Sequence, residues 1–410
     1  MILAVASLVG VSAAENAVAA SLAGRLDASL RVAGPRTGAL VQDLTSGTRI
    51  YARRASVRRL PASVEKLWTT STALRRYGAA HTFRTAVLAM ARPSAGGTVA
   101  GNLYLRGAGD PNFGAVDTGA LALALRRAGV RRVTGHVVGD ESRFDPFRGV
   151  PTSFLRPSPD VEPLSALVYA RDKYRGRYVT SPPRYAAGAL TLALGRAGVK
   201  VRNKHAGAGR TPPGARRLAV IGSPRVGTLI AETNRPSDNF FAETLLKDLG
   251  ADFGEKGSTA AGAAVVRAEA RALGLHPAVT DGSGLSRRDA TSPAQIVGLL
   301  QAMRRSATFR ASLAHFGRPG DTLEDRLKGT YAARHCAAKT GSLHDVSSLA
   351  GYCTAPSGHL LAFGIFMSGI HSVDHARALQ DAMITTLLSS ALPGSKATPP
   401  SAGGGAQPRR

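Results

Sequence analysis

The sequence predicts an α/β fold in which one sheet with helices packed on it is split by an inserted second domain. Strand-like and helical patterns occupy residues 15–81, and similar patterns return at 216–392. Between them, residues 82–215 alternate short strand-like pieces with Gly and Pro, which indicates a separate unit. The chain has 410 residues, 44% of them hydrophobic, so two domains with buried cores are the expected organisation.

The first part of the chain is predicted to form a helix, two strands and a second helix. Residues 21–32 have a helical pattern, and residues 38–54 are typical of two strands joined by a Ser-Gly turn. Residues 60–74, LPASVEKLWTTSTAL, follow as an amphipathic helix with Pro61 in its first turn. The apolar face of that helix consists of Val64, Leu67, Trp68 and Leu74.

The last part is predicted to be helices followed by three strands and a closing helix. Helical patterns run from about residue 216 to residue 305. The expected strands and the closing helix lie at residues 336–343, 347–355, 360–369 and 374–390. Within the insertion, residues 119–130 and 188–199 share the pattern G-A-L-x-L-A-L-x-R-A-G-V. The pattern indicates a short internal repeat, although a composition rich in Ala explains the similarity equally well.

Both ends of the chain have compositions that differ from the rest. Residues 1–14 hold an apolar run followed by small residues, with Val11 and Ala13 placed as at a cleavage site, so we expect a signal peptide and an exported protein. The alternative is an ordinary apolar N-terminus. Residues 393–410 are rich in Pro, Gly and Ser, and they are expected to be a disordered tail.

The formal net charge of +26 favours association with polyanions such as anionic lipid or an acidic cell-wall polymer. Nucleic acid is not a specific partner by this sequence, because it has no zinc-ligand spacing and only 5% aromatic residues. A biased, Arg-rich composition explains the charge as well. The ten His residues form no ligand pattern, so the sequence predicts neither a metal nor a cofactor.

Ser63 and Lys66 are the first candidates for chemistry. They lie three residues apart in a predicted helix, so their side chains share one face. A hydroxyl nucleophile needs a neighbouring base, and a neutral Lys66 can supply it. Burial and a nearby second cation both lower the pKa of a lysine. The spacing S-x-x-K alone is common, and two polar residues on an ordinary helix are the alternative.

A second candidate group is Ser237, Asp238 and Asn239, which are predicted to lie on a loop between two helices. Ser237 can relay a proton toward a leaving group, and Asn239 can donate to a substrate carbonyl and hold Lys66. All three residue types also favour the start of a helix, so a structural role is compatible with the catalytic one.

The third group, Lys339 to Ser342, lies on a predicted strand that leads into a hairpin. Lys339 supplies the second cation, and Gly341 allows a substrate backbone to approach the strand. Thr340 and Ser342 offer hydroxyls to a carboxylate. The backbone N–H groups of Ser63 and Ser342 can form an oxyanion hole.

Together, S-x-x-K, S-D-N and K-T-G in this order are the signature of penicillin-binding proteins and serine β-lactamases. The runs GAGDPNF, VVGDESRFD and DGSGLSRRDATSP narrow the match. With them the chain resembles the D-alanyl-D-alanine carboxypeptidase/endopeptidase family, the class C low-molecular-mass penicillin-binding proteins, from about residue 21 to 390. The resemblance implies a transpeptidase-like domain split by an insertion and an exported, extracytoplasmic or periplasmic hydrolase. Such an enzyme cleaves peptidoglycan stem peptides after D-alanine through an acyl-enzyme on Ser63, and it is acylated by penicillin.

The resemblance also places the arginine of the D-G-S-G-L-S-R run, here Arg287, near the substrate, with a surface arginine as the alternative. Asp281 and Gly284 of that run are expected to form a turn. Family members often carry a third small domain within the second, and the chain between ARDKYRGRY, which ends at residue 178, and GALTLALGRAGV, which begins at residue 188, is too short for it, so we expect it to be absent or reduced. Asp160 is a possible counterpart of a family aspartate that meets a substrate amine.

Two further questions stay open on the sequence alone. Cys336 and Cys353 flank the predicted hairpin, and either a cross-strand disulfide or two buried thiols fits them. The alternatives to a D,D-peptidase are a β-lactamase of the same fold and a non-catalytic cell-wall-binding protein. The sequence contains no E-x-x-L-N run, in which class A β-lactamases carry their deacylating Glu.

Overall fold

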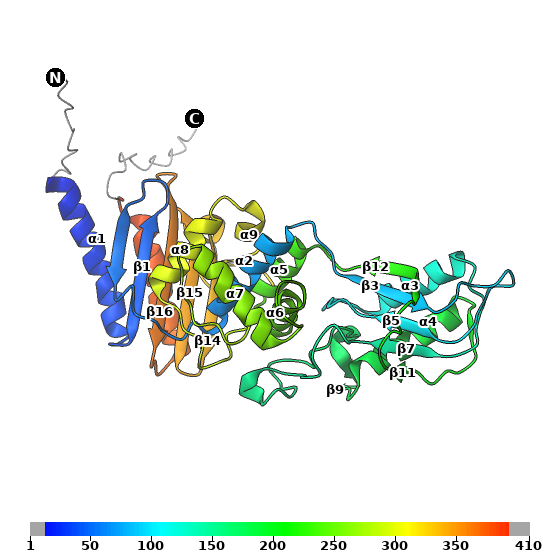
Figure 1. Cartoon of the computed structure of the whole chain (residues 1–410). Helices are drawn as coiled ribbons and strands as arrows, with labels where there is room; N and C mark the ends of the chain where they lie inside the picture. Colours follow the sequence, from blue (N-terminus) through cyan, green and yellow to red (C-terminus); the bar gives the residue numbers. More distant parts are fainter. Residues whose placement is uncertain (1–12, 393–410) are drawn as a thin grey trace, which may run out of the picture.

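The computed structural model describes residues 13–392 (Figure 1). All but the last two residues of the predicted signal peptide, and the whole predicted tail at 393–410, lie outside this range. Helix α1 (Ala13–Val32) is the first described element. Among residues 13–392, no helix is both long enough and apolar enough to cross a membrane.

The first part of the fold contains a six-stranded, wholly antiparallel sheet. Its strands, in spatial order, are β13 (Ala314–His315), β14 (Cys336–Leu343), β15 (Val346–Thr354), β16 (Leu360–Ser368), β1 (Thr37–Asp43) and β2 (Arg49–Arg53). Strand β1, from the start of the chain, therefore pairs with β16, from its end.

Helices cover both faces of this sheet because its strands are apolar on both sides. Successive residues of a strand point to opposite faces. Ile365 of β16 belongs to the buried cluster that includes residues of α1 and α11 (Val373–Ser389), whereas Phe366 belongs to the cluster that includes residues of α2 (Lys66–Tyr77) and α8 (Pro293–Met303). Figure 1 shows α1 on the outer side of the sheet. The other helices of this part are α5 (Val226–Asn234), α6 (Asn239–Phe253), α7 (Thr259–Ala272), α9 (Ala307–Ala311) and α10 (Tyr331–His335).

The inserted segment forms its own sheets, drawn on the right of Figure 1. The larger sheet has the strand order β11 (Gly207–Ala208), β7 (Val137–Asp140), β5 (Leu103–Arg106), β3 (Arg84–Ala89) and β12 (Arg216–Gly222). The predicted boundary at residue 215 is wrong at this point, because β12 pairs antiparallel with β3 and so extends the insertion through Gly222.

The two helices with the shared sequence pattern occupy equivalent places in the insertion. Helix α3 (Ala115–Arg127) is followed by β6 (Arg132–Val133) and then β7, and α4 (Pro182–Arg196) is followed by β10 (Lys200–Val201) and then β11. β6 and β10 are parallel neighbours, and so are β7 and β11. The order helix, short strand, sheet strand therefore occurs twice, as the repeated pattern indicates.

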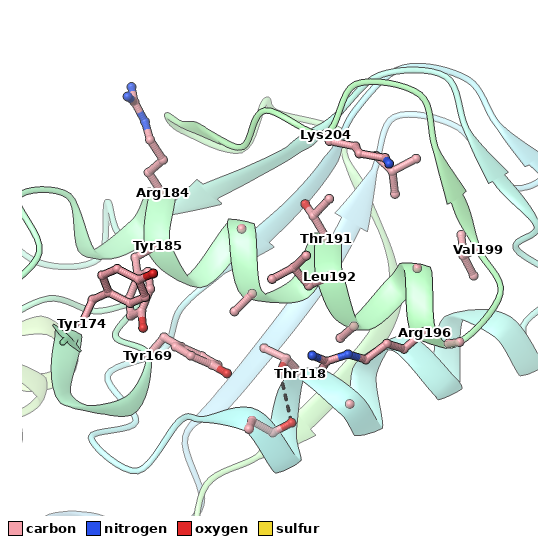
Figure 2. Close-up of a pocket in the computed structure, with 18 of the residues that line it drawn as sticks. Thr118, Tyr169, Tyr174, Arg184, Tyr185, Thr191, Leu192, Arg196, Val199 and Lys204 are labelled. Atoms are coloured by element: carbon pink, nitrogen blue, oxygen red, sulfur yellow. Dashed lines mark hydrogen bonds between the residues drawn. The ribbon is translucent and has the colours of Figure 1, made fainter.

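An open groove of about 1530 Å³ runs along α3 and α4, away from the candidate catalytic residues (Figure 2). Figure 2 shows Thr118 of α3 facing Leu192 and Arg196 of α4, with Tyr174 and Tyr185 at one end. Tyr174 belongs to a two-stranded hairpin, β8 (Lys173–Tyr174) and β9 (Arg177–Tyr178). The remaining short strand of the insertion is β4 (Thr98–Val99).

Candidate active site

Ser63 lies on a single turn of 3₁₀ helix, η1 (Ala62–Glu65), directly before α2. In a 3₁₀ turn, residues i and i+3 eclipse each other, so the side chain of Lys66 is directed at Ser63. The Lys66 Nζ atom lies 2.8 Å from Ser63 Oγ. The predicted pairing of these two side chains is therefore present, although η1 is a tighter turn than the α-helix expected from the sequence.

Lys66 is fully buried, and its amine meets two further acceptors. Nζ donates to Asn239 Oδ1 at 2.6 Å and to the carbonyl oxygen of Ser283 at 2.7 Å. Burial lowers the pKa of Lys66 to about 8, although the nearby carboxyl groups of Asp281 and Glu243 oppose this change. The lysine is thus close to the point at which it can accept a proton at neutral pH.

The S-D-N run lies at the start of α6, and its members have different roles. Asp238 is the N-cap, since its side chain accepts from the backbone N–H of Phe241 at 3.0 Å. Asp238 also forms an ion pair with Arg171 of the insertion at 2.7 Å. Asn239 donates from Nδ2 to the carbonyl oxygen of Asp160 at 3.0 Å, and this bond leaves Oδ1 facing Lys66.

Ser237 and Lys339 form the second half of the site. Lys339 Nζ donates to Ser237 Oγ at 2.8 Å and to its neighbour's carbonyl, that of Thr340, at 2.8 Å. Lys339 is fully buried. Burial, and then the charge of nearby Lys66, hold the pKa of Lys339 well below its usual value. Burial is also the main cause for Lys66, so a second cation is a smaller influence on Lys66 than the sequence suggested.

The strand β14 packs directly against the Ser63 turn at Gly341. A Cβ atom at Gly341 would lie 2.5 Å from the carbonyl oxygen of Pro61 and 3.0 Å from the backbone nitrogen of Ser63. Because glycine has no Cβ atom, Gly341 allows β14 to lie directly beside the candidate nucleophile, Ser63. The disulfide between Cys336 and Cys353 joins directly opposite residues of β14 and β15, which settles the open question about these cysteines.

The remaining predicted site residues surround this core. The Thr340 hydroxyl donates to Thr322 Oγ1 at 2.9 Å, and Ser342 Oγ accepts from Arg377 at 3.4 Å. Arg287 is exposed and pairs with Asp345 at the tip of the β14–β15 hairpin, at 2.7 Å. It therefore lies at the rim of the site, and among residues 13–392 its ion-pair partner is Asp345 rather than a group of the Ser63 site.

Asp281 and Gly284 form the expected turn. The two carboxyl oxygens of Asp281 accept from the N–H groups of Gly284 at 2.7 Å and Ser286 at 2.8 Å. Gly284 has a φ of 86°, and a Cβ atom there would lie 1.9 Å from the carbonyl oxygen of Ala62. The turn is thus pressed against η1, and this contact brings the Ser283 carbonyl to Lys66.

The similarity of this chain to known proteins identifies its family. Residues 18–155 and 168–389 match the family model described as D-Ala-D-Ala carboxypeptidase 3 (S13). The chain belongs to the S13 family. It is a serine D,D-peptidase that acts on peptidoglycan, and the predicted function and family are confirmed.

Individual relatives of this S13 peptidase agree with the family match. A D-alanyl-D-alanine carboxypeptidase of Actinomadura sp. (strain R39) is 29% identical over 86% of this chain and 81% of its own length. The crystal structure of penicillin-binding protein 4 from Haemophilus influenzae superposes with a TM-score of 0.72 and 19% identity, covering 90% of this chain and 98% of that one. A predatory endopeptidase from Bdellovibrio bacteriovorus superposes with a TM-score of 0.57 and 18% identity, covering 86% of this chain and 92% of that one. These likenesses confirm the predicted fold.

Proposed function

We propose that Ser63 is the nucleophile and Lys66 the general base of this S13 peptidase. Ser63 Oγ attacks the carbonyl carbon of the penultimate D-alanine, and its proton passes to the neutral amine of Lys66. The C–N bond to the terminal D-alanine then breaks, the leaving amine takes up a proton, and an ester remains on Ser63. Water hydrolyses that ester and restores the hydroxyl.

The contacts of the Lys66 amine are the observation that carries this proposal. A neutral amine has two N–H groups and one lone pair. The Asn239 and Ser283 oxygens can only accept, so they take both N–H groups. The third direction faces Ser63 Oγ at 2.8 Å, and the lone pair is therefore aimed at the hydroxyl proton.

In the proposed mechanism, the other motif residues bind the substrate and assist the departure of D-alanine. Ser237, held by Lys339, passes a proton to the leaving amine, since its hydroxyl both donates and accepts. Thr340 and Ser342 bind the terminal carboxylate of the substrate, and Lys339 adds positive charge. The backbone N–H groups of Ser63 and Ser342 stabilise the oxyanion. Arg287, at the rim, is proposed to meet the substrate beyond the scissile bond.

The test of this function is D-alanine release from a diacylated tripeptide that ends in L-Lys-D-Ala-D-Ala, together with mass spectrometry after penicillin treatment. The peptidase releases D-alanine and retains one penicillin as a long-lived adduct. A β-lactamase would hydrolyse penicillin rapidly without retaining it, and a non-catalytic wall-binding protein would show neither activity. Splitting of cross-linked muropeptide dimers would add endopeptidase action to the carboxypeptidase action.

The pH dependence of acylation follows from the pKa of Lys66. Below about 8 the amine is protonated and accepts no proton from Ser63; above it the amine is neutral. The rate constant for penicillin acylation is therefore expected to rise between about pH 6 and pH 9, with its midpoint near the lysine pKa. Stopped-flow measurement across buffers, with thermal melting at each pH as control, checks this. A rate that falls over the same range would contradict Lys66 as the base.

We propose that a signal peptide directs this protein out of the cytoplasm and that it acts in the periplasm or another extracytoplasmic part of the cell envelope. Action on peptidoglycan requires access to the wall. The net charge of +26 supports association with anionic wall polymers or the membrane surface. Penicillin-binding protein 4 of H. influenzae has also been crystallised in complex with a β-lactam, which supports β-lactams as inhibitors here.

A further inference from the structure

Four carboxyl groups lie buried behind the catalytic lysine proposed above. Glu65, Glu243, Asp281 and Asp289 all have side chains closed to solvent. Among residues 13–392, no group of acidic, His or Cys side chains is arranged to hold a metal ion. Buried acids need hydrogen-bond partners to offset the loss of hydration, so the partners of Asp281 and Glu243 indicate what these two residues do.

Asp281 holds the peptide unit whose carbonyl contacts Lys66. In the Ser283–Gly284 peptide, the C=O accepts from Lys66 Nζ at 2.7 Å and the N–H donates to Asp281 Oδ1 at 2.7 Å. A carboxyl oxygen on one side of a peptide and an amine on the other fix its plane, and each bond polarises the other. Asp281 therefore determines where this carbonyl points.

Glu243 holds the two preceding backbone groups. Its Oε1 atom accepts from the N–H of Gly282 at 2.9 Å and from the N–H of Ser283 at 2.8 Å. Glu243 is one helical turn after Asn239 on α6, so both side chains lie on the same face of that helix. Helix α6 thus sets two of the three contacts of the Lys66 amine, one through Asn239 directly and one through Glu243 and the loop.

We propose that Glu243 and Asp281 are positioning residues for the general base. By fixing the Ser283 carbonyl against the lysine, they keep one N–H of the neutral amine occupied and leave its lone pair facing Ser63. The inference rests on the proposed function, in which Lys66 accepts the proton of Ser63. It adds a backbone carbonyl and its two carboxyl supports to the groups that make this transfer possible.

The action of Glu243 depends on its oxygen rather than on its charge. Burial, and then the neighbouring Asp281, raise the pKa of Glu243 to about 8. One carboxyl oxygen accepts both loop N–H groups in either protonation state. A glutamine at this position retains that oxygen, whereas an alanine leaves both N–H groups without an acceptor.

The experiment compares Glu243→Ala, Glu243→Gln and the wild-type chain in stopped-flow acylation by a fluorescent penicillin, which separates the dissociation constant of the first complex from the acylation rate constant. For Glu243→Ala, the rate constant is expected to fall about 100-fold with little change in the dissociation constant, because a misaligned base slows the chemical step. Glu243→Gln is expected to restore most of the rate.

Asp248→Asn is the matched control. Asp248 is also fully buried and lies on the same helix, but it pairs with Arg143 of the insertion at 3.2 Å rather than with the Ser283 loop. Its substitution is expected to lower thermal stability without changing the acylation rate constant. If Glu243→Ala does not fold, Glu243→Asp, which withdraws the carboxyl by one methylene, takes its place in the comparison.

Two results would overturn the inference while leaving the proposed function intact. One is a Glu243→Ala (or Glu243→Asp) protein that is acylated as fast as wild type. The other is a folded Glu243→Gln protein that is as slow as Glu243→Ala. Absence of any penicillin adduct on the wild-type protein would instead contradict the proposed function itself, so the two failures are distinguishable.

Discussion

Ser63→Ala is expected to abolish both penicillin labelling and D-alanine release. The substitution removes the only atom of that side chain able to form the ester, while the methyl group fits the half-exposed position of the hydroxyl. Loss of a covalent nucleophile removes the acylation route itself rather than slowing it. Intact-protein mass spectrometry after penicillin treatment is expected to show the unmodified mass.

Ser71→Ala is a matched control for this variant. Ser71 is a buried serine on α2, and its hydroxyl donates to the carbonyl oxygen of Trp68 at 3.1 Å, away from the site. The Ser71→Ala protein should be labelled by penicillin to the same extent as wild type. An adduct of undiminished amount on the Ser63→Ala protein would refute the assignment of the nucleophile, and peptide mapping of that adduct would reveal the true one.

Lys66→Ala is expected to reduce the acylation rate constant about 1,000-fold, within the range that a general base contributes. The alanine leaves Ser63 without a proton acceptor at 2.8 Å, and it leaves the Asn239 and Ser283 oxygens without their shared donor. Burial of an ionisable group is costly, so removing it is compatible with a folded protein. Stopped-flow acylation and circular dichroism measure the two effects separately.

The control for Lys66→Ala is Lys247→Met. Lys247 is an equally buried lysine, but its amine bonds to Asp145 at 2.7 Å and to the carbonyl oxygen of Phe147 at 2.8 Å in the insertion. The folded Lys247→Met protein should be acylated by penicillin at the wild-type rate. Near-normal acylation of Lys66→Ala would mean that another group takes the proton of Ser63.

Residue-type patterns were enough to predict the groups whose chemistry is in their side chains. The contacts of Lys66 with Ser63 and Asn239 were expected from the sequence. Ser237 and Lys339 form a separate hydrogen-bonded pair that the sequence did not specify. The sheet that carries the last motif was also predictable, because β14 and β15 are strand-like runs on either side of a turn and β16 is an almost wholly apolar run.

Other parts of the site gave no comparable signal. The Ser283 carbonyl is a backbone group, and any residue there would supply the same oxygen. Glu243 carried a weak signal, as an acid four residues after Asn239 inside the apolar run NFFAETLLK. Arg171 pairs with Asp238 only because the insertion folds back onto α6. That contact depends on tertiary structure, as does the assignment of β12 to the insertion.

The pairing of β1 with β16 has a consequence for biosynthesis. β1 is synthesised early, whereas its partner β16 is among the last elements to be synthesised. The chain between the two strands includes the whole insertion. The six-stranded sheet cannot be completed until β16 has been synthesised. Contacts between residues so far apart in the sequence also form slowly. If Ser63 and Lys339 act together as proposed, a partly synthesised chain is expected to be inactive, because Ser63 is made long before Lys339.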